Sequence, residues 1–174
     1  PVMQIGLSVL SSMPEVLRKS NWNVTALLGH RGGTVEVVEL TAGDTTELNY
    51  GVAVDLGTTT LAAHLVDLNS SETVATKAKY NSQVSFGDDV IARIMYAQSE
   101  AHRKQMQDLI VADINDLISA LVVDAKVKLH DVNYIICAGN TTMTHLLYGL
   151  DPANIRKEPY IPCSMHPPAV RAAE

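Results

Sequence analysis

The segment from Tyr50 to Leu68, YGVAVDLGTTTLAAHLVDL, consists of two apolar runs separated by a short polar turn. The runs Tyr50 to Leu56 and Leu61 to Leu68 have the composition of β-strands, and Gly57 with three threonines lies between them. A tight turn with glycine at its tip lets the backbone come close to a bound group. The segment therefore predicts a hairpin whose turn, residues 55–60, can contact a ligand.

This turn carries groups that bind phosphate. Its consecutive N–H groups can form an anion-binding nest, and the hydroxyls of Thr58, Thr59 and Thr60 are further donors. Asp55 can hold Mg²⁺ through water, because Mg²⁺ keeps much of its hydration shell at nucleotide sites. A Walker A loop and a Rossmann turn are excluded, since each joins a strand to a helix. The alternative is a plain hairpin, in which Asp55 to Gly57 form only a turn and the threonines only favour strands.

Downstream of the hairpin, the pattern continues in the order β-β-β-α-β-α. Alternation from Thr73 to Tyr80 predicts a third antiparallel strand, and an apolar stripe at helical spacing predicts a long helix from His102 to Val127. Asn133 to Ala138 predicts a strand parallel to the first and buried on both faces, with Cys137 as a small buried residue. The expected fold class is α/β, a mixed sheet with helices on its faces, and ribonuclease-H-like folds begin in this order.

A second turn of similar composition, Gly139-Asn140-Thr141-Thr142, opens a helix that is expected to end at Gly149. Its N–H groups lie at a helix N-terminus, where an anion is favoured. Asn140 or Thr141 can equally serve as an N-cap and nothing more. Because ligands gather at strand ends in such sheets, two turns of this kind at neighbouring strands favour a shared binding site.

A third polar segment, Tyr80 to Ile94, contains a loop, a helix that Asp88 or Asp89 can cap, and Arg93. Two interpretations remain open for it. The segment can line a cleft, or Arg93 can form a surface pair with Asp89 four residues earlier in the helix.

The first fifty residues predict a separate small α+β domain. Ser12 to Glu15 resembles a capping box with proline in the first turn, so a short helix is expected from there to Lys19. Asn23 to Leu28 and Thr34 to Leu40 are then expected to form two strands. The polar segment Thr41 to Asn49 is a plausible boundary, which divides the chain into domains 1–49 and 50–174.

Composition limits the class of protein. With 47% apolar and 18% charged residues, the chain is globular, and a net charge of −6 argues against a nucleic-acid partner, which requires clustered Lys and Arg. No run approaches the ~20 apolar residues that cross a bilayer, and the N-terminus lacks signal-peptide features, so we expect a soluble, cytoplasmic protein without a membrane partner. The cysteines and histidines lack metal-ligand spacing; Met143 is expected in the core and His145 on the surface.

Three segments together resemble a known family: GVAVDLGTTT from Gly51, YNSQVSFGDDVIARI from Tyr80, and ICAGNTTMTHLLYGLDPANIRKEPYIP from Ile136. They are similar to the reductive activators of corrinoid-dependent methyltransfer proteins, which are ferredoxin-like or metal-binding ATPases of the sugar-kinase and actin superfamily. The resemblance covers about Gly51 to Pro162, and residues 1–49 are more weakly similar to the family's small middle domain. It implies that residues 50–174 are the incomplete N-terminal lobe of an actin-like ATPase domain.

The resemblance implies a modular parent protein that binds ATP and Mg²⁺. An N-terminal iron–sulfur domain supplies an electron, and ATP hydrolysis drives reduction of Co(II) corrinoid to Co(I) on a partner corrinoid protein or methyltransferase. Asp55 would be the catalytic, metal-organising residue of the first phosphate loop, which Gly57, Thr58, Thr59 and Thr60 complete. The turn facing it would be formed by Gly139 and Asn140, with Thr141 next to them, as further nucleotide-binding residues.

The chain departs from this family in what it lacks. It has no cysteine cluster for an iron–sulfur centre, and the second lobe with the adenosine pocket would follow Glu174. We therefore expect the parent protein to be an enzyme and this chain alone to bind ATP poorly and to be inactive. Two alternatives remain, another phosphotransferase of the superfamily, such as a sugar or acid kinase, and a non-catalytic partner-binding module.

Overall fold

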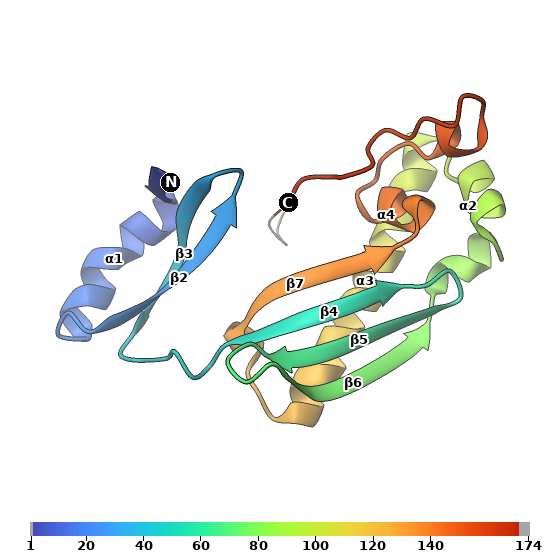
Figure 1. Ribbon diagram of the computed structural model, residues 1–174. Helices are drawn as coiled ribbons and strands as arrows, with labels where there is room; N and C mark the ends of the chain where they lie inside the picture. The colour runs from blue at the N-terminus through green and yellow to red at the C-terminus, as the bar shows by residue number, and fades with distance from the viewer. Residues whose placement is uncertain (1, 171–174) are drawn as a thin grey trace. The chain divides into compact units, whose positions relative to one another are not determined.

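The computed structural model describes residues 2–170, so the outermost ends of the two expected domains, Pro1 and residues 171–174, lie outside the described part (Figure 1). The chain forms two compact units, one of residues 2–49 together with residues 168–170 and the other of Tyr50–Pro167. Each unit has its own sheet, and each sheet contains both parallel and antiparallel pairs. The mixed α/β class that the sequence predicts is therefore confirmed.

The first unit is a three-stranded sheet with one helix. Its strands lie in the order β1-β3-β2, with β1 parallel and β2 antiparallel to β3. Its helix, α1, packs on β3. The element bounds are β1 Val2–Ile5, α1 Leu7–Lys19, β2 Val24–Arg31 and β3 Thr34–Ala42.

The helix prediction for this unit is wrong at its start. Helix α1 begins at Leu7, and Pro14 lies inside it rather than in a first turn capped by Ser12. Val9, Met13 and Val16 recur at helical spacing and are buried or half-buried, so the apolar face begins before the supposed capping box. Strand β1 was not predicted, because its four residues carry no alternation of polarity.

The second unit has a four-stranded sheet in the order β6-β5-β4-β7. Strands β4, β5 and β6 form an antiparallel meander, and β7 is parallel to β4 on its other side. These are the pairings that the sequence predicts, and every boundary lies within one residue of the expected one. The strands are β4 Tyr50–Leu56, β5 Thr60–Asp67, β6 Glu72–Tyr80 and β7 Val132–Gly139.

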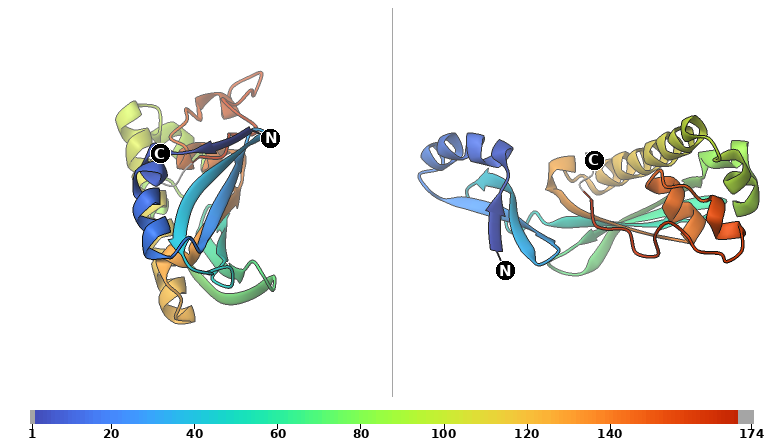
Figure 2. Two further views of the ribbon diagram at one scale, coloured as in Figure 1. Left: turned by 90° about the vertical axis from the view of Figure 1, so that its left-hand side faces the viewer. Right: turned by 90° about the horizontal axis from the view of Figure 1, so that it is seen from above.

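The helices of this unit lie along one face of its sheet (Figure 2). Helix α3, Glu100–Ala125, packs on β5 and β6, and α4, Thr141–Leu147, packs on β7 and α3. The predicted stripe of α3 is buried in the core, and Gly149 has the positive φ of 66° expected after the end of α4. The other helical segments are η1 Ser82–Phe86, α2 Val90–Tyr96, η2 Leu129–Asp131 and η3 Ala153–Arg156.

Strand β7 is not buried on both faces, contrary to prediction. Tyr134 and Ile136 are 62% and 57% exposed, and Cys137 is also exposed. The reason is position in the sheet: among the described residues β7 pairs with β4 alone and forms the edge. An apolar run indicates a strand, but its burial depends on how many neighbours the strand has.

None of the helices in residues 2–170 combines the length and the apolar character that crossing a membrane requires.

Candidate functional site

The two predicted turns lie side by side in the second unit, at the C-terminal ends of the neighbouring strands β4 and β7. Strand β4 ends at Leu56, which pairs with Gly139 at the end of β7, so the segments that follow both strands start at neighbouring positions. The side chain of Asn140 contacts the first turn, with its Nδ2 atom 3.4 Å from Oγ1 of Thr58. The same side chain caps α4 through a hydrogen bond from the N–H of Met143. Asn140 is thus an N-cap that also touches the first turn.

Both turns require glycine. A Cβ atom on Gly57 would overlap the backbone oxygen of Thr60, so the chain could not close the turn along its present path. A Cβ atom on Gly139 would lie 2.8 Å from Cβ of Leu56 in the neighbouring strand. The two backbones therefore approach each other more closely than side chains would permit.

The backbone carbonyls of Gly57, Thr58 and Thr59 in the first turn each accept a hydrogen bond from a residue later in the chain. Asn81 supplies two of these donors: its Nδ2 atom donates to the oxygen of Gly57 over 2.9 Å, and its backbone N–H donates to Thr59 over 2.9 Å. Between them, the oxygen of Thr58 accepts a hydrogen bond from Arg93. Three successive carbonyls are therefore held on one side of the turn.

This arrangement fixes the direction of the N–H groups. These peptide bonds are trans, so each carbonyl points opposite to the N–H of the next residue. The N–H groups of Thr58 and Thr59 donate no hydrogen bond within the part of the chain that the structure describes. Thr59 is exposed at the surface and Thr58 is half-buried. The turn thus has the outward-facing N–H groups that an anion-binding nest needs.

Arg93 is the central residue of this support. It is fully buried on α2, and its Nε atom donates to the oxygen of Gly87 over 2.9 Å. One terminal nitrogen lies 3.2 Å from Oε1 of Gln83 and 3.2 Å from the sulfur of Met143. Of the two interpretations left open for this segment, the surface pair with Asp89 is excluded, because Arg93 points into the core. Asp89 instead caps α2 by accepting from the N–H of Ala92 over 2.8 Å, as predicted.

Asn81 and Gln83 were not singled out from the sequence. Both are buried, and the side chain of Asn81 caps the short helix η1 by accepting from the N–H of Gln83. The Nε2 atom of Gln83 donates to the carbonyl of Met106 on α3 over 2.7 Å. Asn81 and Gln83 belong to no periodic pattern of polar and apolar residues. Only the resemblance of the segment from Tyr80 to a known family could have drawn attention to them.

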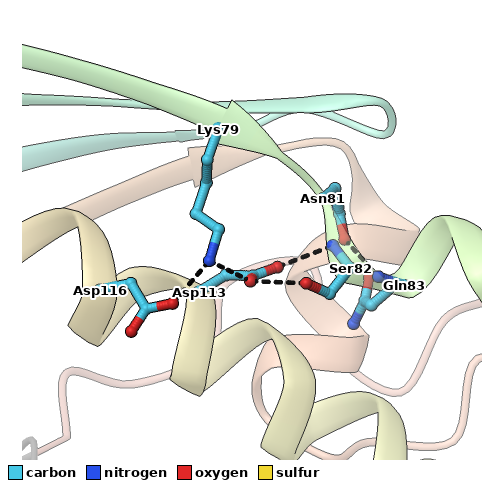
Figure 3. A network of polar contacts seen from close by, with 6 residues as sticks. All are labelled: Lys79, Asn81, Ser82, Gln83, Asp113 and Asp116. Atoms are coloured by element: carbon cyan, nitrogen blue, oxygen red, sulfur yellow. Dashed lines mark hydrogen bonds and ion pairs between the residues drawn. The ribbon is translucent and has the colours of Figure 1, made fainter.

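A buried carboxylate anchors the same segment to α3 (Figure 3). Asp113 accepts hydrogen bonds from the N–H and the hydroxyl of Ser82, over 2.8 and 2.7 Å, and its oxygen lies 2.7 Å from Nζ of Lys79. The same lysine pairs with the exposed Asp116 at 2.7 Å. Burial raises the pKa of Asp113, but the bonds from Lys79 and Ser82 outweigh it, so the pKa lies below its ordinary value of 3.8.

Replacing Asp113 by Asn should destabilise the protein and alter its response to acid. Breaking a buried ion pair costs about 3–5 kcal/mol, and we expect a loss near the lower figure because Lys79 is partly exposed. A lowered pKa means that the carboxylate stabilises the fold fully above pH 3.8 and that this contribution is lost as the pH falls through the folded-state pKa. Urea unfolding at pH 7 and at several pH values below 4 would measure both effects.

Asp116→Asn is the matched control, since Asp116 pairs with the same lysine but is exposed. Exposed pairs contribute up to about 1 kcal/mol, so this variant should lose little stability. Equal losses in the two variants would contradict the importance given to the buried contacts.

Asp55 lies at the end of β4 on the face turned away from the helices. Its neighbours Val54 and Leu56 are buried, whereas Asp55 is exposed beside the first turn. Among the described residues there is no cluster of three or more acidic, histidine or cysteine side chains that could hold a metal. Asp55 therefore provides one carboxylate, which suits an ion held mainly by water and ligand oxygens.

His145 differs from its prediction. Met143 is buried as expected, but His145 is buried too, because α4 turns both side chains away from solvent. Its Nδ1 atom lies 2.7 Å from the carbonyl of Thr141, one turn earlier in the helix, so Nδ1 is the protonated nitrogen. His145 is therefore part of the core beneath the site.

Family models match both units of the chain. The model described as "RACo linker region" matches residues 2–47, and the model described as "RACo middle region" matches residues 50–174.

Two related proteins are similar over much of this chain. The corrinoid activation enzyme RamQ of Eubacterium limosum is 30% identical over 113 residues, which is 64% of this chain and 19% of that protein. A solved structure of a "Reductive activator for corrinoid,iron-sulfur protein" is 35% identical, with a TM-score of 0.89 over 98% of this chain. The match covers 27% of that structure, so the chain spans well under half the length of either relative.

Proposed function

The chain belongs to the RACo family of corrinoid reductive activators, and we propose that it supplies the first phosphate-binding loop of an ATP-dependent activator. In this proposal the whole protein hydrolyses ATP and transfers one electron to a partner corrinoid protein. Co(II) is thereby reduced to Co(I), and ATP is converted to ADP and phosphate. The iron–sulfur centre that supplies the electron lies in another part of the protein.

One observation carries the nucleotide part of this proposal. The carbonyls of Gly57, Thr58 and Thr59 are all held inward, so successive N–H groups face outward next to threonine hydroxyls. A plain hairpin needs no such support behind its turn. Outward N–H groups on a rigid backbone fit phosphate oxygens, which accept several hydrogen bonds at once.

The neighbouring residues suit a nucleotide with its metal. Asp55 would hold Mg²⁺ through water, and the ion would neutralise charge on the phosphates. Gly139, Asn140 and Thr141 would form the facing wall of the site, because Asn140 already contacts the hydroxyl of Thr58. These residues would bind and orient the phosphates, and the rest of the nucleotide would be held by other parts of the protein.

The fold supports the same assignment. The meander β4-β5-β6, the parallel β7 and the helices on one face have the connectivity with which ribonuclease-H-like, actin-like ATPase lobes begin. We assign residues 50–174 to the N-terminal lobe of such a domain and residues 1–49 to a small α+β domain preceding it. The conclusion about partners rests on the named relatives, one a corrinoid activation enzyme and the other an activator of a corrinoid iron–sulfur protein.

The proposal is tested with the full-length protein that carries this chain and a Co(II) corrinoid partner protein. Phosphate release and the Co(II) electron-paramagnetic signal are followed together, with a low-potential reductant present. We expect the Co(II) signal to disappear only when Mg-ATP is added, and phosphate to be released at the same time. Reduction that proceeds equally without ATP, or in the presence of a non-hydrolysable analogue, would contradict the proposal.

A further inference from the structure

Arg93 is a fully buried cation whose hydrogen-bond partners are all neutral. The guanidinium contacts the carbonyls of Gly87 and Thr58, the amide oxygen of Gln83 and the sulfur of Met143. Among the described residues, no carboxylate lies within ion-pair distance of it. Arginine stays charged at neutral pH, and burial of that charge is unfavourable. Asp88 and Asp89 attract the charge, but only from beyond ion-pair distance.

The neutral partners satisfy the hydrogen bonds of the guanidinium but not its charge. A purely structural support could be built from neutral donors, as Asn81 shows by holding the carbonyls of Gly57 and Thr59 on either side. The middle carbonyl, that of Thr58, is the one that receives a charged donor. The positive charge therefore lies directly behind the centre of the turn.

A charged donor at one end of a peptide unit affects its other end. The oxygen of Thr58 and the N–H of Thr59 belong to the same trans peptide and point in opposite directions. Hydrogen bonds in series polarise one another, so the guanidinium strengthens the N–H of Thr59 as a donor. This N–H faces away from Arg93 and donates to no described residue.

We propose that Arg93 is the positioning residue of this site, and that its charge, acting through the Thr58–Thr59 peptide, selects an anionic ligand. The phosphate chain bound on the outer side of the turn then adds to Asp88 and Asp89 in offsetting the charge of Arg93. This inference rests on the proposed function, because the nucleotide named there is its anion. The contact with Met143 also ties the turn to α4, which Asn140 caps.

Two substitutions separate charge from packing. In the full-length protein, Arg93→Gln removes the positive charge but keeps an N–H donor. Arg93→Lys keeps the positive charge but replaces the planar guanidinium by an ammonium group. We expect Arg93→Gln to raise the Kd for Mg-ATP and for inorganic pyrophosphate at least about tenfold, and Arg93→Lys to stay within about threefold of wild type. KM should rise with Kd while kcat falls less, and the affinity for uncharged adenosine should not change.

Arg103→Gln is the matched control. Arg103 on α3 donates to the carbonyls of Ala97 and Gln98, away from the turn. Its loss should leave the affinity for Mg-ATP and pyrophosphate unchanged. Circular dichroism and a thermal melt would show whether each variant is folded.

A measurement on the wild-type chain applies even if neither Arg93 variant folds. Pyrophosphate is titrated at millimolar concentration into the ¹⁵N-labelled full-length protein, and the backbone amide resonances are followed. The amide proton of Thr59 should shift more than those of Thr58 and Thr60. A shift at Thr59 no larger than at its neighbours would overturn the inference.

The outcomes distinguish this inference from the function on which it rests. If the wild-type protein binds neither Mg-ATP nor pyrophosphate, both the proposed function and the inference about Arg93 are wrong. Wild-type protein that binds them while a folded Arg93→Gln variant binds equally well would remove the inference alone. Equal losses of affinity in Arg93→Gln and Arg93→Lys would also remove it, since the charge would then have no effect.

Discussion

Asp55→Ala in the full-length protein is expected to lower the kcat of Mg-ATP hydrolysis about a hundredfold or more, which is typical when one preorganised charge-stabilising contact is lost. Asp55 is the acidic side chain at the end of β4, directly before the first turn, and it is exposed. In the proposed site, its removal would leave Mg²⁺ without a protein carboxylate on this side of the phosphates. Phosphate release at saturating Mg-ATP measures the effect.

The fold should tolerate this change. The pairing of β4 with β5 and β7 at Asp55 uses the backbone, and substitutions of exposed side chains usually change the free energy of unfolding by no more than about 0.5 kcal/mol. Asp108→Ala, an exposed carboxylate on α3, is the matched control and should hydrolyse ATP at the wild-type rate. Wild-type turnover in folded Asp55→Ala would remove Asp55 from the mechanism.

The strands of the second unit could be predicted because their signals are local. The apolar run ending at Leu56, the turn at Gly57 and the alternation from Thr73 lie within a few residues of the structures that they specify. The stripe of α3 is long enough to fix the type of the element and its buried face. The order of these elements then limits the possible sheets, since a parallel β7 needs the crossover that α3 provides.

Features that depend on contacts distant in sequence could not be predicted in this way. Strand β1 is four residues long and pairs with β3 some thirty residues later, without a pattern of its own. The exposure of Cys137 follows from the place of β7 at the sheet edge, which its apolar composition does not reveal. His145 is buried because of how α4 packs, although a histidine in a short helix is usually assigned to the surface.

The candidate site likewise has one part that could be predicted from the sequence and one part that could not. The outward part, Asp55 and the Gly-Thr turn, is visible in one hexapeptide because its residues are consecutive. The support behind it comes from Asn81 and Arg93, which lie 24 and 35 residues beyond their partners in the turn. Sequence patterns show which groups can bind a ligand, but the donors that orient the backbone become evident only when the fold brings them together.

Gly57→Ala should have the second large effect. A Cβ atom there overlaps the backbone oxygen of Thr60, the first residue of β5, which pairs with Tyr80 of β6 and cannot move without disturbing that pairing. The turn must therefore shift, and the bond from Asn81 to the carbonyl of Gly57 is disturbed with it. We expect a loss of about 1–3 kcal/mol in the free energy of unfolding, as for other overpacked sites, measured by urea unfolding. Because the N–H groups lose their direction, we also expect kcat/KM for ATP hydrolysis to fall about a hundredfold or more.

Gly51→Ala tests whether this effect belongs to the turn. Gly51 lies in the same strand, but the nearest atoms to its Cβ would belong to the flexible side chain of Leu68, at 3.1 Å or more. This variant should lose less stability and keep its ATP hydrolysis, since Gly51 pairs at the opposite end of β4 from the turn. If Gly57→Ala were folded and hydrolysed ATP as fast as Gly51→Ala, the close turn at Gly57 would have no part in phosphate binding.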